Sequence, residues 1–280
     1  MYDEQPRLGV GLGYRLPLHD EIIANAHRID FLEFISDQYL YASTEKMDRL
    51  TALREHFPLI PHGVGLSVGT AGALDDDYLR RLSIVGDAVN APWMSDHLSF
   101  TKVPDTDIEQ LTPLWFTEES LATVCRNMRQ LKTVVHRPFL LENITYYFTL
   151  PHNDMTEAQF ITRVLEETDT GLLLDLNNVW VNSVNHRFDP YEFLDAIPVE
   201  RTLQIHLAGG KLVQDMVVDT HSTPVTEPVW DLLGYVLDRA PVKAILLEWD
   251  QDFPDFEVLM EHLERAREAF CARRPAGVPA

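Results

Sequence analysis

Eight short apolar runs, each separated from the next by a longer segment, constrain the fold of this chain more than any other feature. The runs span residues 8–14, 29–35, 59–68, 93–100, 138–144, 171–178, 202–209 and 244–250. In the clearest intervening segments, 75–89, 156–169, 226–240 and 256–270, apolar residues recur every three or four positions, as in helices that pack on a sheet. Strands that alternate with helices favour a parallel sheet.

Eight strands in 280 residues predict one α/β domain, a (β/α)₈ TIM barrel over residues 1–270, with a flexible tail at 271–280. A doubly wound open sheet is the alternative. Thr156 and Thr226 stand where they could cap the helices that start there, and Asp75 marks the start of another helix. In a TIM barrel the active site lies at the C-terminal ends of the strands.

Polar side chains gather at those ends. The residues there, or in the loops directly after, are His62, Asp96, His97, Glu142, Asn143, Asp175, Asn177, Asn178, His186, His206, Asp219, His221, Glu248 and Asp250. A single strand-end histidine is commonly structural, and a single carboxylate can cap a helix or accept loop amides. Together, however, these carboxylates and imidazoles converge on one mouth, with no Lys or Arg at the strand ends to balance them. A bound cation solves that electrostatic problem, so we expect a metal site.

Imidazole and carboxylate ligands without thiolate suit Fe, Mn, Zn or Co. There are more ligands than a single four-coordinate ion needs, so two or more ions are expected, with a carboxylate such as Glu142 bridging them. The residues alone leave redox and hydrolytic chemistry both open.

The bulk composition limits the partners. A net charge of −21 repels phosphate backbones, so we expect no nucleic-acid partner. No apolar run is long enough to cross a bilayer, and the N-terminus is not a signal peptide. Two cysteines, Cys125 and Cys271, are too few for a disulfide framework, which favours a reduced, cytoplasmic setting.

Eight motifs then carry a resemblance. "HGVGLSVG", "SDHLSF", "LLENITYYF", "LLLDLNNVWVNSVNH", "IHLAGG", "VVDTHS", "PVWDLL" and "LLEWDQDFP" follow one another in order over nearly the whole chain. In these motifs the chain resembles the multinuclear non-haem iron-dependent oxidative enzymes, a family long described as a domain of unknown function, which includes the iron subunit of methanobactin biosynthesis.

The resemblance implies a xylose-isomerase-like barrel with two or three iron ions, in mixed Fe(II)/Fe(III) states, and O₂ as co-substrate. The metal ligands it implies are His62, His97, Glu142, Asp175, His206, Asp219, His221 and Glu248, with Asn178, His186 and Asp250 as further candidates. Among these, we expect Asp175, Glu142 and His221 to be catalytic. Many relatives have a histidine at the position of Gly210, which leaves two or three ions open.

The function that this resemblance implies is oxidative modification of a ribosomally made precursor peptide, at Cys or at Asp/Asn, in natural-product biosynthesis with a leader-binding partner protein. A divalent-metal sugar isomerase or epimerase of the same fold is the main alternative, although no strand-end lysine offers itself as its acid–base group. A metal-dependent nuclease and a non-catalytic scaffold are weaker alternatives.

Overall fold

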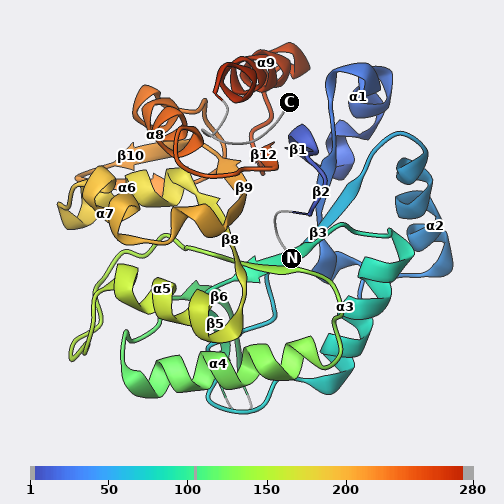
Figure 1. The fold of residues 1–280 in the computed structure, drawn as a ribbon. Coiled ribbons are helices and arrows are strands. Elements are labelled where there is room, and N and C mark those ends of the chain that lie inside the picture. The colour runs from blue at the N-terminus through green and yellow to red at the C-terminus, as the bar shows by residue number, and fades with distance from the viewer. Residues whose placement is uncertain (1–3, 104–105, 274–280) are drawn as a thin grey trace.

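The computed structural model describes residues 4–103 and 106–273, and its centre is a closed barrel of parallel strands (Figure 1). The strands are β1 (Gly9–Gly13), β2 (Leu32–Ile35), β3 (Leu59–Gly63), β4 (Met94–His97), β7 (Phe139–Glu142), β8 (Gly171–Asp175), β9 (Thr202–Leu207) and β12 (Ala244–Leu247). β1 pairs with β12 on one side and with β2 on the other, which closes the barrel. The TIM barrel is therefore confirmed, and the open sheet is excluded.

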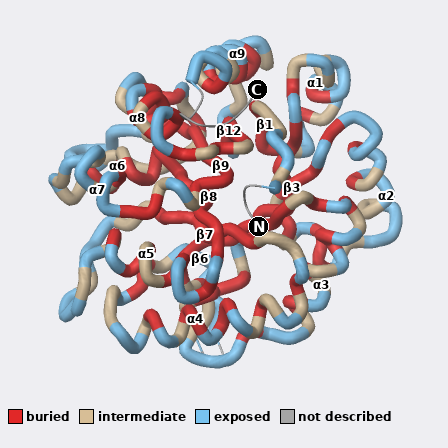
Figure 2. The backbone as a smooth tube through the Cα atoms, viewed as in Figure 1, coloured by how far each residue is buried: buried red, intermediate tan, exposed pale blue. Residues whose placement is uncertain are grey.

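Helices surround this barrel. They are α1 (His19–Ala24), α2 (Thr44–Ala52), α3 (Asp76–Ala88), α4 (Glu118–Lys132), α5 (Glu157–Thr168), α6 (Leu176–His186), α7 (Pro190–Ala196), α8 (Glu227–Leu237) and α9 (Phe256–Ala272). The strands are buried almost throughout, whereas the outer sides of the helices are exposed (Figure 2). α9 continues two residues beyond 270, and the rest of the expected tail, 274–280, lies outside the described residues.

Two hairpins were not expected from the sequence. β5 (Phe100–Val103) pairs with β6 (Thr106–Thr112) after β4, and β10 (Gly210–Val213) pairs with β11 (Met216–Asp219) after β9. Both follow the C-terminal end of a barrel strand, so they belong to the face where a TIM barrel carries its active site. The described part of the chain contains no helix that is long and apolar enough to cross a membrane.

A separate apolar layer fills the barrel interior. It comprises Phe31, Ile60, Trp93, Leu140, Leu173, Leu203, Ala244 and Leu246, and it includes no helix residue. Side chains two positions apart on a strand share a face. The residue two positions after Ile60 is His62, after Leu140 it is Glu142, and after Leu173 it is Asp175. The interior layer thus lies next to the polar groups of the mouth, on the side toward the N-terminal ends of the strands.

Of the two threonines expected to cap helices, only Thr156 does so. The side chain of Thr156 accepts from the backbone N–H of Gln159, whose own side chain accepts from Thr156 N, so α5 has a complete capping box. For Thr226 the expectation is wrong. The second residue of α8 is Pro228, which has no N–H, and the N–H of Val229 donates to the backbone oxygen of Thr226 instead.

This difference provides a matched test. We expect Thr156→Ala to lower the free energy of unfolding by about 1 kcal/mol, because an exposed N-cap is lost without loss of packing. Thr226→Ala should cost less than about 0.5 kcal/mol, since its hydroxyl caps nothing. Urea unfolding followed by circular dichroism measures both, and equal losses would contradict this assignment of the caps.

Candidate metal centre

Three linked clusters of side chains occupy the mouth of the barrel. The inner cluster is His62, His97 and Glu142; the middle cluster is Glu142, Asp175 and His206; the outer cluster is Asp175, His221 and Glu248. Within each cluster the candidate ligand atoms lie within 4.8 Å of one another. Glu142 belongs to two clusters and so does Asp175, so these carboxylates are placed to bridge neighbouring ions.

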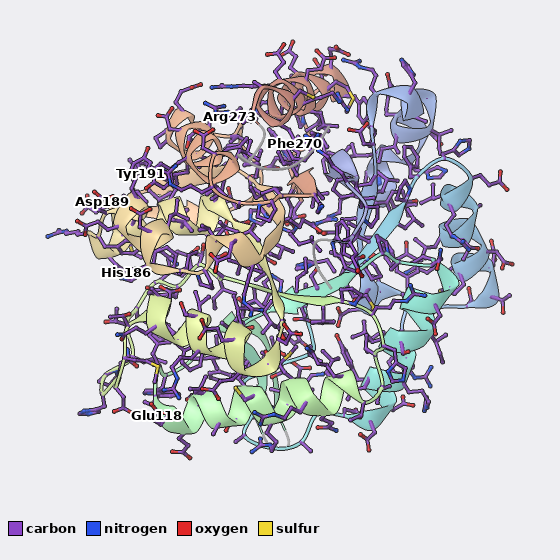
Figure 3. All side chains as sticks on the ribbon, viewed as in Figure 1. Glu118, His186, Asp189, Tyr191, Phe270 and Arg273 are labelled. Atoms are coloured by element: carbon purple, nitrogen blue, oxygen red, sulfur yellow. The ribbon has the colours of Figure 1, made fainter. Side chains whose placement is uncertain are left out.

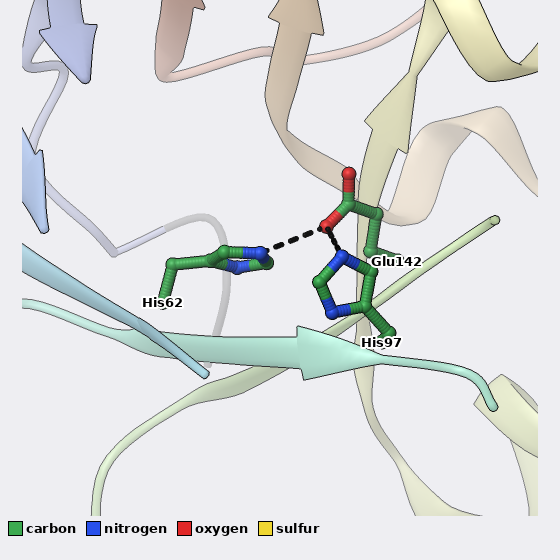
Figure 4. Close-up of side chains that lie close together, drawn as sticks. All are labelled: His62, His97 and Glu142. Carbon is green, nitrogen blue, oxygen red and sulfur yellow. Dashed lines mark ion pairs between the residues drawn. The ribbon is translucent and has the colours of Figure 1, made fainter. Parts of the chain in front are cut away.

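The inner cluster shows how each imidazole is oriented (Figure 4). Nε2 of His62 lies 3.2 Å from Oε2 of Glu142, and Nε2 of His97 lies 3.3 Å from the same oxygen. The other ring nitrogens have outer partners: Nδ1 of His97 contacts the backbone oxygen of Gly63 at 3.1 Å, and Nδ1 of His62 contacts Ser95 Oγ at 2.9 Å. Because a carbonyl only accepts, Nδ1 of His97 carries the proton and Nε2 is left to face the centre.

His206, in the middle cluster, is held by a carboxylate that sequence reasoning missed. Its Nε2 lies 3.0 Å from Oε1 of Glu33, the second residue of β2, while its Nδ1 lies 3.3 Å from both Glu142 and Glu248. Gln204 donates to Glu33 and accepts from Trp93 Nε1 at 2.7 Å. Glu33 is two positions after Phe31 of the interior layer, so the alternation that marks the other mouth residues also marks Glu33.

The outer cluster is the most open part of the mouth. The side chains of His221 and Asp219 are 16% and 17% exposed, and Nε2 of His221 lies 2.8 Å from Oδ1 of Asp219. Nδ1 of His221 contacts Oδ2 of Asp250 at 3.1 Å. His221 has φ of +46°, a conformation that is uncommon for residues other than glycine. The backbone therefore turns at His221. The side chains of Asp219 and His221, the first and last residues of "DTH", are nevertheless in contact.

β8 is an apolar strand that ends in a buried carboxylate, Asp175, and the contacts of the two carboxylate oxygens explain this arrangement. Oδ1 of Asp175 accepts from the backbone N–H of Asn178 at 2.6 Å and so caps α6. Its Oδ2 is buried without a hydrogen-bond partner, and no described Lys or Arg forms an ion pair with Asp175. One oxygen is structural and the other faces the clusters.

The expectation that no Lys or Arg balances the carboxylates of the mouth is wrong for Glu248 and Asp250. Arg15, two residues after β1, contacts Oε1 of Glu248 at 3.1 Å and donates from Nε to Oδ1 of Asp250 at 2.9 Å. β1 ends at Gly13, one residue before the end of the apolar run 8–14, and the side chain of Arg15 extends over the mouth. Asp250 is thus paired with Arg15 and His221.

The remaining candidates lie outside the three clusters. Asn178 donates to the backbone oxygen of Asn143 at 3.0 Å, and Asp96 accepts from the backbone of Leu66 and of His97. His186 ends α6 at the periphery in Figure 3 and stacks on Tyr146, with ring centroids 4.5 Å apart. Asp219 accepts from Asn177 at 2.8 Å and reaches the outer cluster only through its contact with His221.

Charge in the mouth is redistributed by burial and by close neighbours. Burial opposes ionisation of Glu142, but His97 and His206 outweigh it and hold the pKa of Glu142 at about 2. Burial also opposes protonation of His97, yet Glu142 raises the pKa of His97 to about 9. For Asp175, burial first and the charge of Glu142 second raise the pKa well above its ordinary value.

These residues fit a metal centre. Asp175 Oδ2 is buried without a partner among the described residues, and Glu142 Oε2, His206 Nδ1 and His221 Nε2 are buried without a well-aligned hydrogen bond, their near neighbours being other ionisable groups of the mouth. Buried polar atoms normally have partners, and ions that bind several such atoms at once remove the cost. The donors are imidazole and carboxylate without thiolate, as Fe, Mn, Zn or Co prefer.

One prediction concerns Glu33. Glu33→Gln removes the charge that orients the ring of His206, while it keeps the shape of the side chain and a group that can contact Gln204. We expect the affinity for metal to fall by about 10- to 100-fold with the fold intact. Competitive chelator titration measures the affinity, and Glu257→Gln on the exposed surface of α9 is the control. Unchanged affinity would show that Glu33 does not support the centre.

A second prediction concerns the metal-free protein. The pKa values of His97, His206 and His221 are raised, because nearby carboxylates outweigh burial. The contribution of His97 to stability is complete below the ordinary value of 6.5 and is lost as pH rises through about 9, its folded-state pKa, and the raised pKa values of the other two histidines act in the same direction. The chelator-treated protein should therefore lose stability over this range, whereas added metal, which binds the deprotonated ligands, should reverse the trend. Urea midpoints at both ends of the range test this, and a flat profile without metal would contradict it.

Comparison with known proteins agrees with this arrangement. The family of RiPP precursor modification enzymes MbnB/TglH/ChrH, which act on ribosomally synthesised and post-translationally modified peptides, matches residues 9–271. A UPF0276 protein of Caulobacter vibrioides is 40% identical over 278 residues, 99% of each chain, and one of Acaryochloris marina is 39% identical over 267 residues, 95% of this chain and 96% of that one.

Solved structures show the same fold at low identity. D-psicose 3-epimerase of Clostridium cellulolyticum superposes with a TM-score of 0.62 at 11% identity, covering 96% of this chain and 99% of that one. Endonuclease IV of Thermus thermophilus gives a TM-score of 0.59 at 15% identity, covering 94% of this chain and 99% of that one. These are xylose-isomerase-like barrels, which confirms the expected fold class. With the match along almost its whole length, the chain belongs to the MbnB/TglH/ChrH family of RiPP precursor modification enzymes.

Proposed function

We propose that this protein is a multinuclear iron enzyme that uses O₂ to oxidise a residue of a precursor peptide, at Cys or at Asp/Asn. The observation that carries the proposal is the chain of three clusters joined through Glu142 and Asp175, in a member of a peptide-modifying family. A single zinc ion needs no more than four ligands, whereas this mouth offers three groups of donors.

The protein's own groups would hold and orient the metals. His62, His97 and Glu142 would bind the innermost ion, Asp175 and His206 would share the next with Glu142, and His221 and Glu248 would complete the outermost with Asp175. Asp219 and Asp250 would support His221. Iron supplies the electron transfer to O₂ that no side chain can perform.

Access to the centre would be through the outer cluster. His221 is its most exposed member and Asp219 beside it is similarly exposed, whereas Asp175 and His206 are completely buried. A peptide side chain would therefore approach along His221, and the buried groups would keep water from the inner sites. Asp175, Glu142 and His221 would thus be the residues nearest to the reaction. We place the reaction in the cytoplasm, which suits the two free cysteines.

Gly210 begins β10, and a Cβ there would lie 2.8 Å from the backbone oxygen of Val218. A histidine at this position would require the β10–β11 hairpin to shift. In this chain, position 210 therefore offers no ligand, and a third ion would depend on His221 and Glu248.

The metal content tests the proposal. Protein prepared without oxygen and loaded with Fe(II) should hold two or three iron ions and consume O₂ with its peptide. Asp175→Asn keeps an oxygen that can cap α6 but removes the charge, so it should lose iron and activity while the metal-free form stays folded. Asp231→Asn, on an exposed position of α8, is the matched control. One tightly bound zinc ion with no iron uptake would exclude the redox function.

Substrate delivery is a further expectation. A net charge of −21 gives no general attraction for an acidic peptide, so we propose that a partner protein binds the leader of the precursor. Tethering the leader should raise turnover by on the order of 10²-fold. Rates with and without the partner, on full-length and leaderless peptide, test this, and four equal rates would make the partner unnecessary.

A further inference from the structure

A cavity separate from the three clusters lies beside the metal centre. It has a volume of about 540 Å³ and is bounded by the segment after β1, the end of β2, α2 and the loop after β12. Arg15 and Asp250 form the wall that it shares with the mouth. None of the eight expected ligands of the mouth lines this cavity.

Arg15 joins the two spaces. Its guanidinium contacts Glu248 of the outer cluster at 3.1 Å and donates to Asp250 at 2.9 Å, and its side chain is only 13% exposed. A group bound on the cavity side of Arg15 is therefore separated from a candidate metal ligand by the width of one guanidinium.

Two more cations lie on the α2 side. Lys46 and Arg49 both line the cavity and are three residues apart, so they share one face of the helix. Lys46 lies in the first turn of α2, where the helix dipole disfavours a positive charge. The helix carries this local cost at a position that faces the cavity.

Neither cation is neutralised by a strong ion pair. Nζ of Lys46 donates to the backbone oxygen of Gln38 at 2.8 Å and lies 4.8 Å from the ring centre of Tyr39, and it pairs with no carboxylate in the described ranges. Arg49 has Glu45 at 4.0 Å, but both side chains are mostly exposed, at 69% and 83%, so the pair contributes little. Both charges remain available to an incoming anion.

The rest of the lining is largely aromatic and apolar. Tyr14, Phe34, Tyr39 and Phe253 contribute rings, and Leu50 adds an aliphatic side chain. Burial, followed by the nearby Tyr14, raises the pKa of Tyr39 to about 12, and the charge of Arg49 acts in the opposite direction on both tyrosines. Tyr14, Tyr39 and Arg49 all line the same cavity.

We propose that this cavity binds a carboxylate of the substrate peptide, with Lys46 and Arg49 as its anchors and Arg15 as the boundary to the metal centre. The aromatic walls would receive the apolar part of the same residue. The proposal rests on the proposed function for the identity of the substrate as a peptide, and not for the existence of the site. Because consecutive Cα atoms are about 3.8 Å apart, the residue that carries the carboxylate, or a close neighbour, would face the outer cluster.

The test uses small probes and metal-free protein, so that no carboxylate can bind to iron. N-acetyl-L-leucine offers an α-carboxylate, N-acetyl-L-glutamic acid α-amide offers a side-chain carboxylate, and N-acetyl-L-leucinamide offers none. Calorimetric titration should show binding of one or both acids and at least about tenfold weaker binding of the neutral amide. The acid that binds more tightly identifies which carboxylate of the peptide the cavity receives.

A double variant locates the site. Lys46→Gln combined with Arg49→Gln should weaken binding of the acids by about tenfold or more. Arg54→Gln is the matched control, since Arg54 follows closely in sequence, is exposed, and donates to the backbone oxygen of Ala88 outside the cavity. Binding of the acids that equals that of the amide, or that survives in the double variant, would overturn the proposal.

The result is separable from the proposed function. Binding is measured without iron and without turnover, so failure to find iron or oxidation leaves this test valid. Conversely, an active iron enzyme whose double variant binds the acids like the wild-type protein would retain its function and lose the carboxylate site. With active enzyme and precursor peptide, the double variant should raise KM with little change in kcat, because the anchors do not touch the reacting atoms.

Discussion

Ionisable groups in the mouth of a closed barrel cannot be solvated by water, and they must therefore compensate one another. Glu33, Glu142, Asp175 and Glu248 are all nearly or completely buried, above an apolar layer that excludes water. Without metal, the carboxylates around His206 outweigh burial and raise its pKa, and burial with the charge of Glu142 raises the pKa of Asp175, so both shifts favour bound protons that reduce the excess of negative charge. Metal ions would replace those protons, and the donor atoms would keep their places. The requirement for compensation explains why both histidines and carboxylates occur around the mouth.

The backbone satisfies this requirement through simple periodicity. Several barrel strands deliver an apolar side chain to the interior and, two residues later, a polar one to the mouth, as for Leu140 and Glu142 or Ile60 and His62. Asp175 adds a second role, because the strand ends where α6 begins and one carboxylate oxygen caps that helix. The same residue that would bridge two ions thereby fixes the direction in which the chain leaves the barrel.

The eight strands and most of the mouth could be predicted from the sequence because both depend on local patterns. Apolar runs mark the strands, and the polar residues at their ends mark the mouth. Glu33 could have been found by the same rule, but it stands inside "DFLEFI", where a single charge looks like an interruption of the strand. Its partner, His206, is 173 residues away, and no local pattern connects the two.

Arg15 and the two hairpins were beyond sequence reasoning for a different reason. Arg15 follows the strand, and whether its side chain turns toward solvent or over the mouth depends on Asp250, 235 residues later. The hairpins are partly polar, and the segment that forms β6, "TDIEQLT", lacks the apolar character of the barrel strands. Thr226 failed as a cap because the helix begins with Glu227 and Pro228, which removes one of the N–H groups that a cap can bind.

The net charge of −21 and the cationic cavity act over different distances. Exposed charges are screened beyond about 8 Å at physiological ionic strength, so the net charge acts only weakly on a distant peptide and the final contacts depend on nearby groups. Within that distance, a carboxylate in the cavity would meet Lys46, Arg49 and Arg15 against a single lining carboxylate that could oppose them, Asp250, which is already paired with Arg15. Local attraction can thus hold an acidic group close to an acidic protein. The net charge supplies no long-range attraction for an acidic peptide, and this is the condition under which a leader-binding partner becomes useful.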